Sequence, residues 1–296
     1  MASAELQMVI DLLRAGPLPR DAGWEEQRAG LDRLSEMGPP PSDATFEPLE
    51  IGGRPAAWIQ ADAASAERTL LYLHGGGYCV GSLKSHRGLA TDLSRAAGAR
   101  VLLLDYRLAP EHPFPAAVDD AVAAYRALLE QGADARRLAI GGDSAGGGLT
   151  AATLLALRDA DLPLPAAAVL LSPWLDLSLS GASMDACAER DPMVQRAPLQ
   201  RMADAYLAGA DPRAALASPL FADLRGLPPL LIHVGTAETL LDDATRFAAR
   251  ARAAGIDVTL EAWDDMVHVW HAFAFLLPEA RAANTAIGAF LRERLG

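Results

Sequence analysis

The chain has 296 residues, 51% of them hydrophobic, and a formal net charge of −12. This composition supplies one large core and disfavours nucleic acid or an anionic membrane as a partner. No apolar run comes near the roughly twenty residues of a transmembrane helix, and charges within residues 1–15 argue against a secretory signal, so we expect a cytoplasmic protein without a membrane span.

Cys79 and Cys187 are the only cysteines in the chain. Two cysteines are too few for a disulfide framework, and their spacing does not suit a metal site. We therefore expect two free thiols, no metal and no cofactor.

Residues 1–42 are predicted to form one or two amphipathic helices. A Gly-Pro-Leu-Pro segment at 16–19 interrupts them and Gly-Pro-Pro-Pro at 38–41 ends them, because both residue types break helices. Since these helices precede the first predicted strand, we expect them to form a cap segment. From 46 to 59 two short strands flank a Gly-Gly pair, a pattern typical of a hairpin.

Six apolar runs follow the hairpin, and predicted helices separate them. Runs that are apolar on both faces belong to strands covered by helices on both sides, so the pattern predicts a mainly parallel sheet. With the hairpin it gives an α/β fold whose eight-stranded sheet has helices on both faces. The runs are residues 69–73, 100–104, 138–141, 167–171, 230–234 and 258–262, and the helices are placed near 85–97, 116–130, 145–159, 242–254 and 279–295.

Residues 176–224 do not fit this alternation. They contain a polar loop and a helical segment near 199–208, where one helix would suffice to connect two strands. We expect this insertion to be the second part of a helical cap over the strand ends. Residues 43–175 and 225–296 would then form the core.

Ser144 lies in a Gly-Asp-Ser-Ala-Gly segment, residues 142–146, where a predicted strand ends and a predicted helix begins. The small flanking residues allow the strained turn that exposes a nucleophilic hydroxyl at the end of a sheet. Ala145 would then offer a free N–H at the positive end of the helix. The alternative is an ordinary tight turn between strand and helix.

A second glycine-rich segment, His74 to Gly77, directly follows the run at 69–73. Glycine leaves main-chain N–H groups uncovered, and such groups stabilise the oxyanion that forms during acyl transfer. We expect Gly75 and Gly76 to act as donors together with Ala145, and His74 to hold the loop rather than to act as a base. The alternative is a flexible turn without a ligand.

A serine nucleophile needs a general base, and the base needs a carboxylate that fixes its tautomer. Of the six histidines, only His268 and His271 follow the last predicted strand, where an α/β hydrolase places its base. We expect His268 in this role and keep His271 as the alternative. Glu238 lies on the loop directly after the predicted strand at 230–234 and is preferred as the acid over Asp242, which starts the next helix and suits a cap.

These segments together resemble the hormone-sensitive-lipase-like family of α/β hydrolases, also called family IV bacterial esterases. The resemblance covers most of the chain, from about residue 69 to residue 268. Its motifs are His-Gly-Gly-Gly-Tyr at 74–78, Asp-Tyr-Arg-Leu-Ala-Pro-Glu at 105–111 and Gly-Asp-Ser-Ala-Gly-Gly at 142–147.

The resemblance implies Ser144 as nucleophile, His268 as base, the same three oxyanion donors and a helical cap over the pocket. Many members carry Asp where this chain has Glu238, and the longer carboxylate can reach the base if its loop is set back. Residues 191–194, Glu238 and residues 268–271 look closest to ε-lactone hydrolases, which makes cyclic esters plausible substrates.

Some residues near the predicted site suggest structural roles. We expect Asp105, Arg107 and Glu111 to form a buried ion-pair network that braces their loop. The bonds before Pro110 and Pro115 are candidates for the cis form.

Other residues near the site have predicted contacts. Asp143 should bind nearby backbone. Tyr78 and Val267 flank the predicted catalytic segments and, with Tyr206, are candidates for the substrate pocket.

We therefore expect a serine carboxylic-ester hydrolase that acts on small short-acyl esters, and on lactones as a further class, through a Ser-His-Glu triad and an acyl-enzyme. Two alternatives remain: an acyltransferase with the same triad, and a non-catalytic small-molecule receptor on the same fold. The expected partner is a small ester or lactone, and a homodimer is left open.

Overall fold

The computed structural model describes residues 3–16 and 22–296. In these residues eight strands form one sheet in the order β1-β2-β4-β3-β5-β6-β7-β8. The strands are β1 (Ala44–Ile51), β2 (Arg54–Ala61), β3 (Ser65–Leu73), β4 (Ala99–Leu104), β5 (Leu138–Asp143), β6 (Ala167–Leu171), β7 (Leu230–Gly235) and β8 (Val258–Trp263). The helices include α1 (Ala4–Arg14), α2 (Trp24–Ser35), α3 (Arg87–Ala97), α4 (Ala116–Glu130), α5 (Ala145–Asp159), α6 (Ser183–Ala186), α7 (Arg196–Leu207), α8 (Leu241–Ala253) and α9 (Pro278–Leu295).

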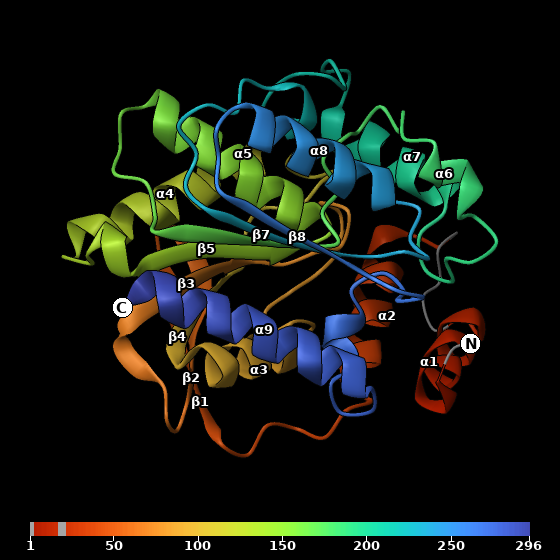
Figure 1. The fold of residues 1–296 in the computed structure, drawn as a ribbon, viewed down its shortest axis with the longest axis horizontal. Coiled ribbons are helices and arrows are strands. Elements are labelled where there is room, and N and C mark those ends of the chain that lie inside the picture. The colour runs from red at the N-terminus through yellow and green to blue at the C-terminus, as the bar shows by residue number, and fades with distance from the viewer. Residues whose placement is uncertain (1–2, 17–21) are drawn as a thin grey trace.

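The sheet confirms the predicted α/β fold. β1 pairs antiparallel with β2, β2 pairs antiparallel with β4, and the remaining pairs from β4 to β8 are parallel. α3 and α9 cover one face, and α4, α5 and α8 cover the other (Figure 1). The helices of residues 116–130 and 145–159 have the predicted ends, and the other three core helices differ from prediction by one or two residues.

The β1–β2 hairpin turns on Gly52 and Gly53, which both have positive φ angles. A Cβ atom on Gly52 would lie 2.7 Å from the backbone of Ala123 in α4. Glycine is therefore required there both for the turn and for the close approach of the helix.

The core lies on both faces of the sheet, as strand β3 illustrates. Leu71 and Leu73 belong to the apolar cluster on one face, and Leu70 and Tyr72 belong to the cluster on the other. Successive side chains of a strand point to opposite faces. The continuous apolar run therefore follows from burial on both sides.

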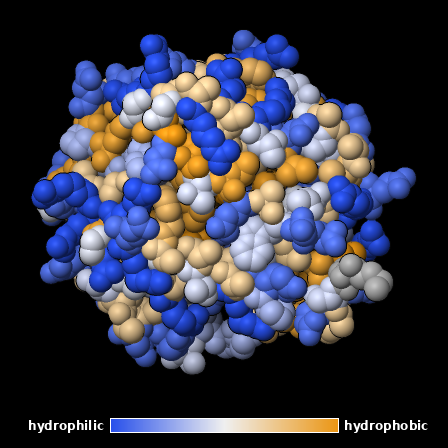
Figure 2. Space-filling model, in the orientation of Figure 1, coloured by the Kyte–Doolittle hydropathy of each residue, from blue (hydrophilic) through white to orange (hydrophobic). Residues whose placement is uncertain are grey.

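Strand β8 forms one edge of the sheet, and its residues are partly exposed. Figure 1 places this edge in the middle of the view, between α8 and α9. In the same orientation, Figure 2 shows apolar surface in the central part of this face and mostly hydrophilic side chains at its rim. No helix in the described part of the chain has the length and apolar character needed to cross a membrane.

The N-terminal helices and the helices α6 and α7 of the 176–224 insertion lie at one end of the sheet (Figure 1), and the two segments contact each other. The guanidinium of Arg201 in α7 lies over the ring of Trp24 in α2, 4.4 Å from its centroid. Arg14 of α1 donates to the carbonyl of Glu189 at 3.3 Å. The helix expected near 199–208 is α7, and most of the predicted break at 16–19 lies outside the described residues.

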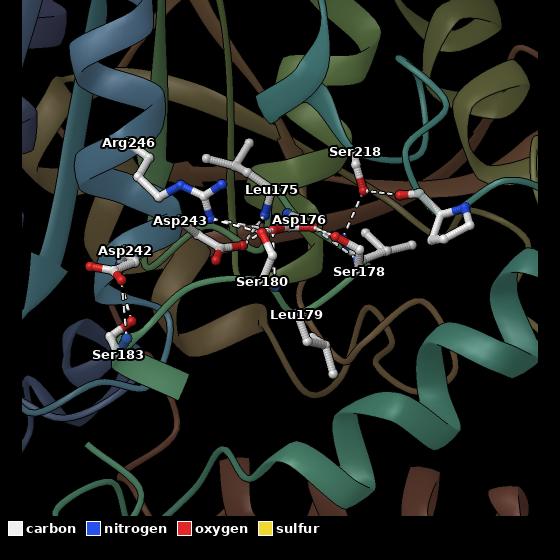
Figure 3. A network of polar contacts seen from close by, with 12 residues as sticks. Leu175, Asp176, Ser178, Leu179, Ser180, Ser183, Ser218, Asp242, Asp243 and Arg246 are labelled. Carbon is white, nitrogen blue, oxygen red and sulfur yellow. Dashed lines mark hydrogen bonds and ion pairs between the residues drawn. The ribbon is translucent and has the colours of Figure 1, made fainter. Parts of the chain in front are cut away.

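A buried polar network anchors the start of the insertion to α8. Figure 3 shows the Asp176 carboxylate, which accepts hydrogen bonds from the backbone and hydroxyl groups of Ser178 and Ser180 and pairs with Arg246 at 3.4 Å. Asp243 of α8 accepts from the backbone N–H groups of Leu175 and Asp176 at 2.8 and 2.9 Å. The chain is thus held where it leaves the sheet.

The two carboxylates of this network differ in their pKa. Burial raises the pKa of Asp243 to about 8, with the neighbouring charge of Asp176 adding to it. Burial also acts to raise the pKa of Asp176, but the hydrogen bonds from Ser178 and Ser180 outweigh it and hold that pKa below its ordinary value.

Candidate active site

Ser144 occupies the strained turn that the sequence predicts between β5 and α5. Its φ is 54° and its ψ is −120°, outside the regions that non-glycine residues favour. A Cβ on Gly146 would lie 1.9 Å from the Leu73 carbonyl oxygen, and one on Gly142 would lie 2.4 Å from the Gly146 carbonyl oxygen. The flanking glycines therefore let α5 start against β3 and β5, which places Ser144 at the carboxyl end of the sheet.

A cavity of about 830 Å³ opens over this turn. Ser144 and His268 both line it, together with Gly76 and Gly77 of the glycine-rich loop. The side chains that enclose it from the cap segments include Trp24, Leu31, Met193, Val194 and Met202. The expected nucleophile and base thus face one common space under the N-terminal helices and the insertion.

His268 and Glu238 are bonded to each other at one side of the cavity. Nδ1 of His268 lies 2.9 Å from Oε2 of Glu238, and both side chains are buried. The second carboxylate oxygen, Oε1, accepts from the Gly235 N–H at 2.6 Å and from the Ser172 hydroxyl at 2.7 Å. Since a carboxylate can only accept, Nδ1 carries the proton and Nε2 is left free to act as a base.

Electrostatics favour the charged form of His268. Burial would lower the pKa of the imidazole, but the hydrogen bond and the charge of Glu238 outweigh it, and the pKa is raised above its ordinary value. An imidazolium is therefore stabilised at this position.

The alternative base and acid are placed elsewhere. His271 is fully buried, does not line the cavity, and has Nε2 at 3.2 Å from Nδ1 of His233. Burial lowers the pKa of His271 well below its ordinary value. The carboxylate of Asp242 accepts from the Ser183 N–H at 3.0 Å, so it anchors the insertion and does not cap α8.

The N–H of Gly75, which the sequence predicts as an oxyanion donor, is already engaged by buried side chains. This N–H is shared between Oδ1 of Asp143 at 3.1 Å and Nε2 of His86 at 3.2 Å. Gly76 and Gly77 line the cavity, and both have positive φ angles. An amide already engaged by a buried carboxylate is not available to a ligand.

His74 has the structural role that the sequence suggests. Its Nδ1–H donates to the Gly75 carbonyl at 2.8 Å, and its ring stacks on Tyr106 with centroids 4.2 Å apart. Burial lowers the pKa of His74 to about 3, with the nearby His86 adding to the effect. Asp143 binds the backbone at Gly75, as predicted, and also accepts from the Tyr72 hydroxyl at 2.8 Å.

The three residues predicted for the substrate pocket lie outside the lining of this cavity. Tyr78, Tyr206 and Val267 are buried and do not line the cavity of Ser144 and His268. The rings of Tyr78 and Tyr206 stack 3.8 Å apart between the glycine-rich loop and α7, and Val267 packs in a cluster with Leu6 and Val9 of α1. These side chains fill the contact between cap segments and core.

The expected network of Asp105, Arg107 and Glu111 is also wrong. Arg107 pairs with Asp120 at 2.7 Å, whereas Glu111 is exposed and pairs with Arg28 of α2. The bonds before Pro110 and Pro115 are cis, as predicted.

Cys79 and Cys187 are both free cysteines, and both are buried. Among the described residues, no group of three or more His, Cys, Asp or Glu side chains is arranged to hold a metal ion.

The sequence analysis missed several residues at the site. Gly77 is the third glycine of the run at 75–77, and nothing in the run itself separates it from the first two. Met193 and Val194 belong to the segment 191–194, whose only signal in the sequence is its resemblance. Ser172 directly follows the run at 167–171, and a polar residue at the carboxyl end of a parallel strand is a signal for a site residue.

Comparisons with known proteins agree with this architecture. The α/β-hydrolase-fold family matches residues 70–272. An acetyl-hydrolase of Streptomyces hygroscopicus is 51% identical over 100% of this chain and 99% of that protein. An esterase crystal structure from the bacterial hormone-sensitive lipase family has a TM-score of 0.98 and 50% identity over the full length of both chains.

A second solved structure, the esterase EstE5, has a TM-score of 0.96 and 47% identity and covers 99% of each chain. The identity and coverage of these relatives extend over the cap segments as well as the core. The chain therefore belongs to the hormone-sensitive-lipase family of α/β hydrolases, as its motifs predicted.

Proposed function

We propose that this protein is a carboxylic-ester hydrolase that cleaves small esters with short acyl chains through Ser144, His268 and Glu238. The observation that carries the proposal is that Ser144 and His268 line one cavity, while Glu238 is hydrogen-bonded to Nδ1 of His268. The names of the relatives, acetyl-hydrolase and esterase, support the same reaction class.

Each residue has a distinct part in the first half of the reaction. The Ser144 hydroxyl attacks the ester carbonyl carbon as Nε2 of His268 takes its proton. The amides of Gly76, Gly77 and Ala145 then donate to the carbonyl oxygen as it becomes an anion. The anion collapses to an acyl-enzyme, and the imidazolium gives its proton to the departing alkoxide.

Water completes the second half. It attacks the acyl-enzyme, Nε2 of His268 accepts its proton, and Ser144 leaves with that proton as the carboxylic acid is released. Glu238 keeps the imidazole in the tautomer that both halves require and stabilises the imidazolium. All steps use the chain's own groups and water.

The cap segments would limit the size of the substrate. We assign residues 1–42 and 176–224 to a cap, and residues 43–175 and 225–296 to the hydrolase core, because the two cap segments contact each other over the cavity. Apolar side chains from both segments line the cavity and suit short acyl chains.

Lactones can be cleaved by the same chemistry, and lactone hydrolysis remains a prediction. The homodimer and the cytoplasmic location also remain predictions.

The test uses p-nitrophenyl butyrate, the ester with which EstE5 crystals were soaked. We expect a burst of p-nitrophenol from the wild type and none from Ser144→Ala, because only the hydroxyl can form the acyl-enzyme. Equal release by both proteins would contradict the proposal. Product analysis with a competing alcohol separates hydrolysis from acyl transfer, which would use the same residues.

A further inference from the structure

Ser172 connects the acid and the base of the proposed triad through one hydroxyl group. It directly follows β6 and is completely buried. Its Oγ donates to Oε1 of Glu238 at 2.7 Å and accepts from the Val269 N–H at 3.2 Å. Val269 is the residue after His268. One partner of the hydroxyl is therefore the proposed acid itself, and the other is the backbone next to the proposed base.

On the acid side, Ser172 supplies a bond from outside the loop that carries Glu238. The other donor to Oε1 is the Gly235 N–H, three residues before Glu238 on the same turn. A glutamate has one more rotatable bond than an aspartate and therefore more ways to turn its carboxylate from the imidazole. Of the two bonds to Oε1, only the one from Ser172 ties the carboxylate to the end of a different strand, β6.

On the base side, Ser172 holds a strained residue. Val269 has φ 50° and ψ 43°, a left-handed conformation that is unfavourable for a β-branched residue. Such a conformation persists only where the surroundings hold it. The hydrogen bond from the Val269 N–H to Ser172 is a restraint on the backbone directly after His268.

Ser172 is itself in a strained conformation, with φ 46°. Most residues avoid this region, and glycine would adopt it without cost. A hydroxyl residue that occupies a position better suited to glycine points to a need for the side chain.

We propose that Ser172 is a positioning residue that aligns Glu238 and His268 with each other. This inference rests on the proposed function, because Ser172 acts only through those two residues. Without the hydroxyl, Oε1 loses one of its two restraints and the Val269 N–H loses its acceptor. The carboxylate and the imidazole then sample misaligned positions, which lowers kcat and leaves substrate binding nearly unchanged.

The test compares Ser172→Ala and Ser172→Gly with Ser94→Ala. Ser94 is a matched control, because it is also completely buried, does not line the cavity, and has a hydroxyl that also makes two bonds, to Ala99 O at 2.7 Å and from Ala61 N at 3.0 Å. We expect both Ser172 variants to lose about tenfold to a hundredfold in kcat for p-nitrophenyl butyrate, with KM changed less than about threefold. Ser94→Ala should keep wild-type kcat.

The glycine variant separates positioning from folding. It removes the hydroxyl but relieves the strain at φ 46°, so we expect it to unfold at a higher temperature than Ser172→Ala while it loses the same activity. Wild-type kcat in Ser172→Gly would overturn the inference. So would equal losses of kcat in Ser172→Ala and Ser94→Ala.

Two further measurements would be unaffected if Ser172 had a purely structural role. In Ser172→Gly the acid limb of the pH profile of kcat/KM should shift to lower pH, because a looser bond to Glu238 lets burial lower the pKa of His268. The double variant Ser172→Gly/Glu238→Gln should have a kcat only slightly below that of Glu238→Gln alone, since both substitutions disturb the same pair of Glu238 and His268. An acid limb that does not shift, or losses of kcat that are fully additive, would overturn the inference about Ser172. Wild-type activity in Ser144→Ala would instead overturn the proposed function.

Discussion

The imidazole of His268 and the carboxylate of Glu238 lie 2.9 Å apart between Nδ1 and Oε2, and both are buried. Glu238 comes from the turn after β7 and His268 from the loop after β8. The pair therefore lies across two neighbouring strand ends of the sheet, beside the cavity that Ser144 also lines.

This pair predicts a pH dependence of the reaction. The base must be neutral to accept a proton, and Glu238 raises the pKa of His268 above its ordinary value of 6.5. The acid limb of kcat/KM should therefore have its midpoint above 6.5 in the wild type. In Glu238→Gln the raising charge is lost and burial dominates, so the midpoint should move to lower pH. A midpoint that does not move would mean that another group titrates.

The acid can also be identified by comparing two alanine variants. We expect Glu238→Ala to lower kcat by about a thousandfold or more, because the base loses the group that orients its tautomer. Asp242→Ala should lower kcat far less, because its carboxylate binds the Ser183 backbone and not the imidazole. Steady-state kinetics on p-nitrophenyl butyrate measure both values. Equal losses, or the reverse order, would reassign the acid.

The raised pKa of Asp243 predicts that the stability of the fold declines as pH rises. Its pKa is about 8 in the folded protein and about 3.9 in an unfolded chain, so between these values the folded state holds a proton that the unfolded state has released. The free energy of unfolding then falls as pH rises through this window. Asp243→Asn stays neutral and keeps an acceptor for the Leu175 and Asp176 N–H groups.

We therefore expect Asp243→Asn to unfold at a higher temperature than the wild type near pH 8.5 and to show a smaller difference between pH 6 and pH 8.5. Thermal unfolding followed by circular dichroism measures both. Asp242→Asn is the control and should follow the wild-type trend. A wild-type trend in Asp243→Asn would show that Asp243 is already ionised in the folded protein.

Arg28 predicts a stabilising link between α2 and the core. It donates to the carbonyls of Cys79 at 2.9 Å and Ala109 at 3.0 Å and also pairs with Glu111. Arg28→Ala should lower the free energy of unfolding by about 1 to 2 kcal/mol, since it leaves two partly buried carbonyls without a donor. Glu111→Ala should cost less, because an exposed ion pair contributes little. Urea unfolding tests the order, and a larger loss for Glu111→Ala would contradict it.

Gly88 of α3 offers a test of substrate length. It lines the cavity, and a Cβ placed there meets no atom within 4 Å. Gly88→Leu should therefore fold normally and occupy part of the cavity, which reduces kcat/KM for p-nitrophenyl octanoate more than for the acetate. Gly88→Ala is the matched control with little added volume. A uniform change across chain lengths would mean that acyl groups do not extend to this position.

The elements of the fold were predictable because their signals are local. Burial on both faces produces continuous apolar runs, and residues 167–171 form β6 with the predicted ends. The same locality applies to Ser144, since the turn depends on its own glycine neighbours. Chain order narrowed the base to His268 and His271, and of these two the structure brings His268 to the cavity that Ser144 lines.

Other features depend on atoms from distant parts of the chain. The choice between Gly75 and Gly77 as a free donor depends on Asp143, almost seventy residues away, whose carboxylate reaches the Gly75 N–H. Glu111 pairs with Arg28 only because α2 packs across its loop. No pattern around either residue contains this information.

The sequence by itself determined the succession of strands and helices along the chain, the family, and the segments from which the candidate site is built. The tertiary structure alone decided which amides are free, which side chains line the cavity and that the Ser172 hydroxyl joins the acid loop to the base loop. The physical reason is the distance along the chain over which each kind of interaction acts. Backbone conformation and burial follow from neighbouring residues, whereas a hydrogen bond needs two groups placed within about 3 Å of each other by the packing of the whole chain.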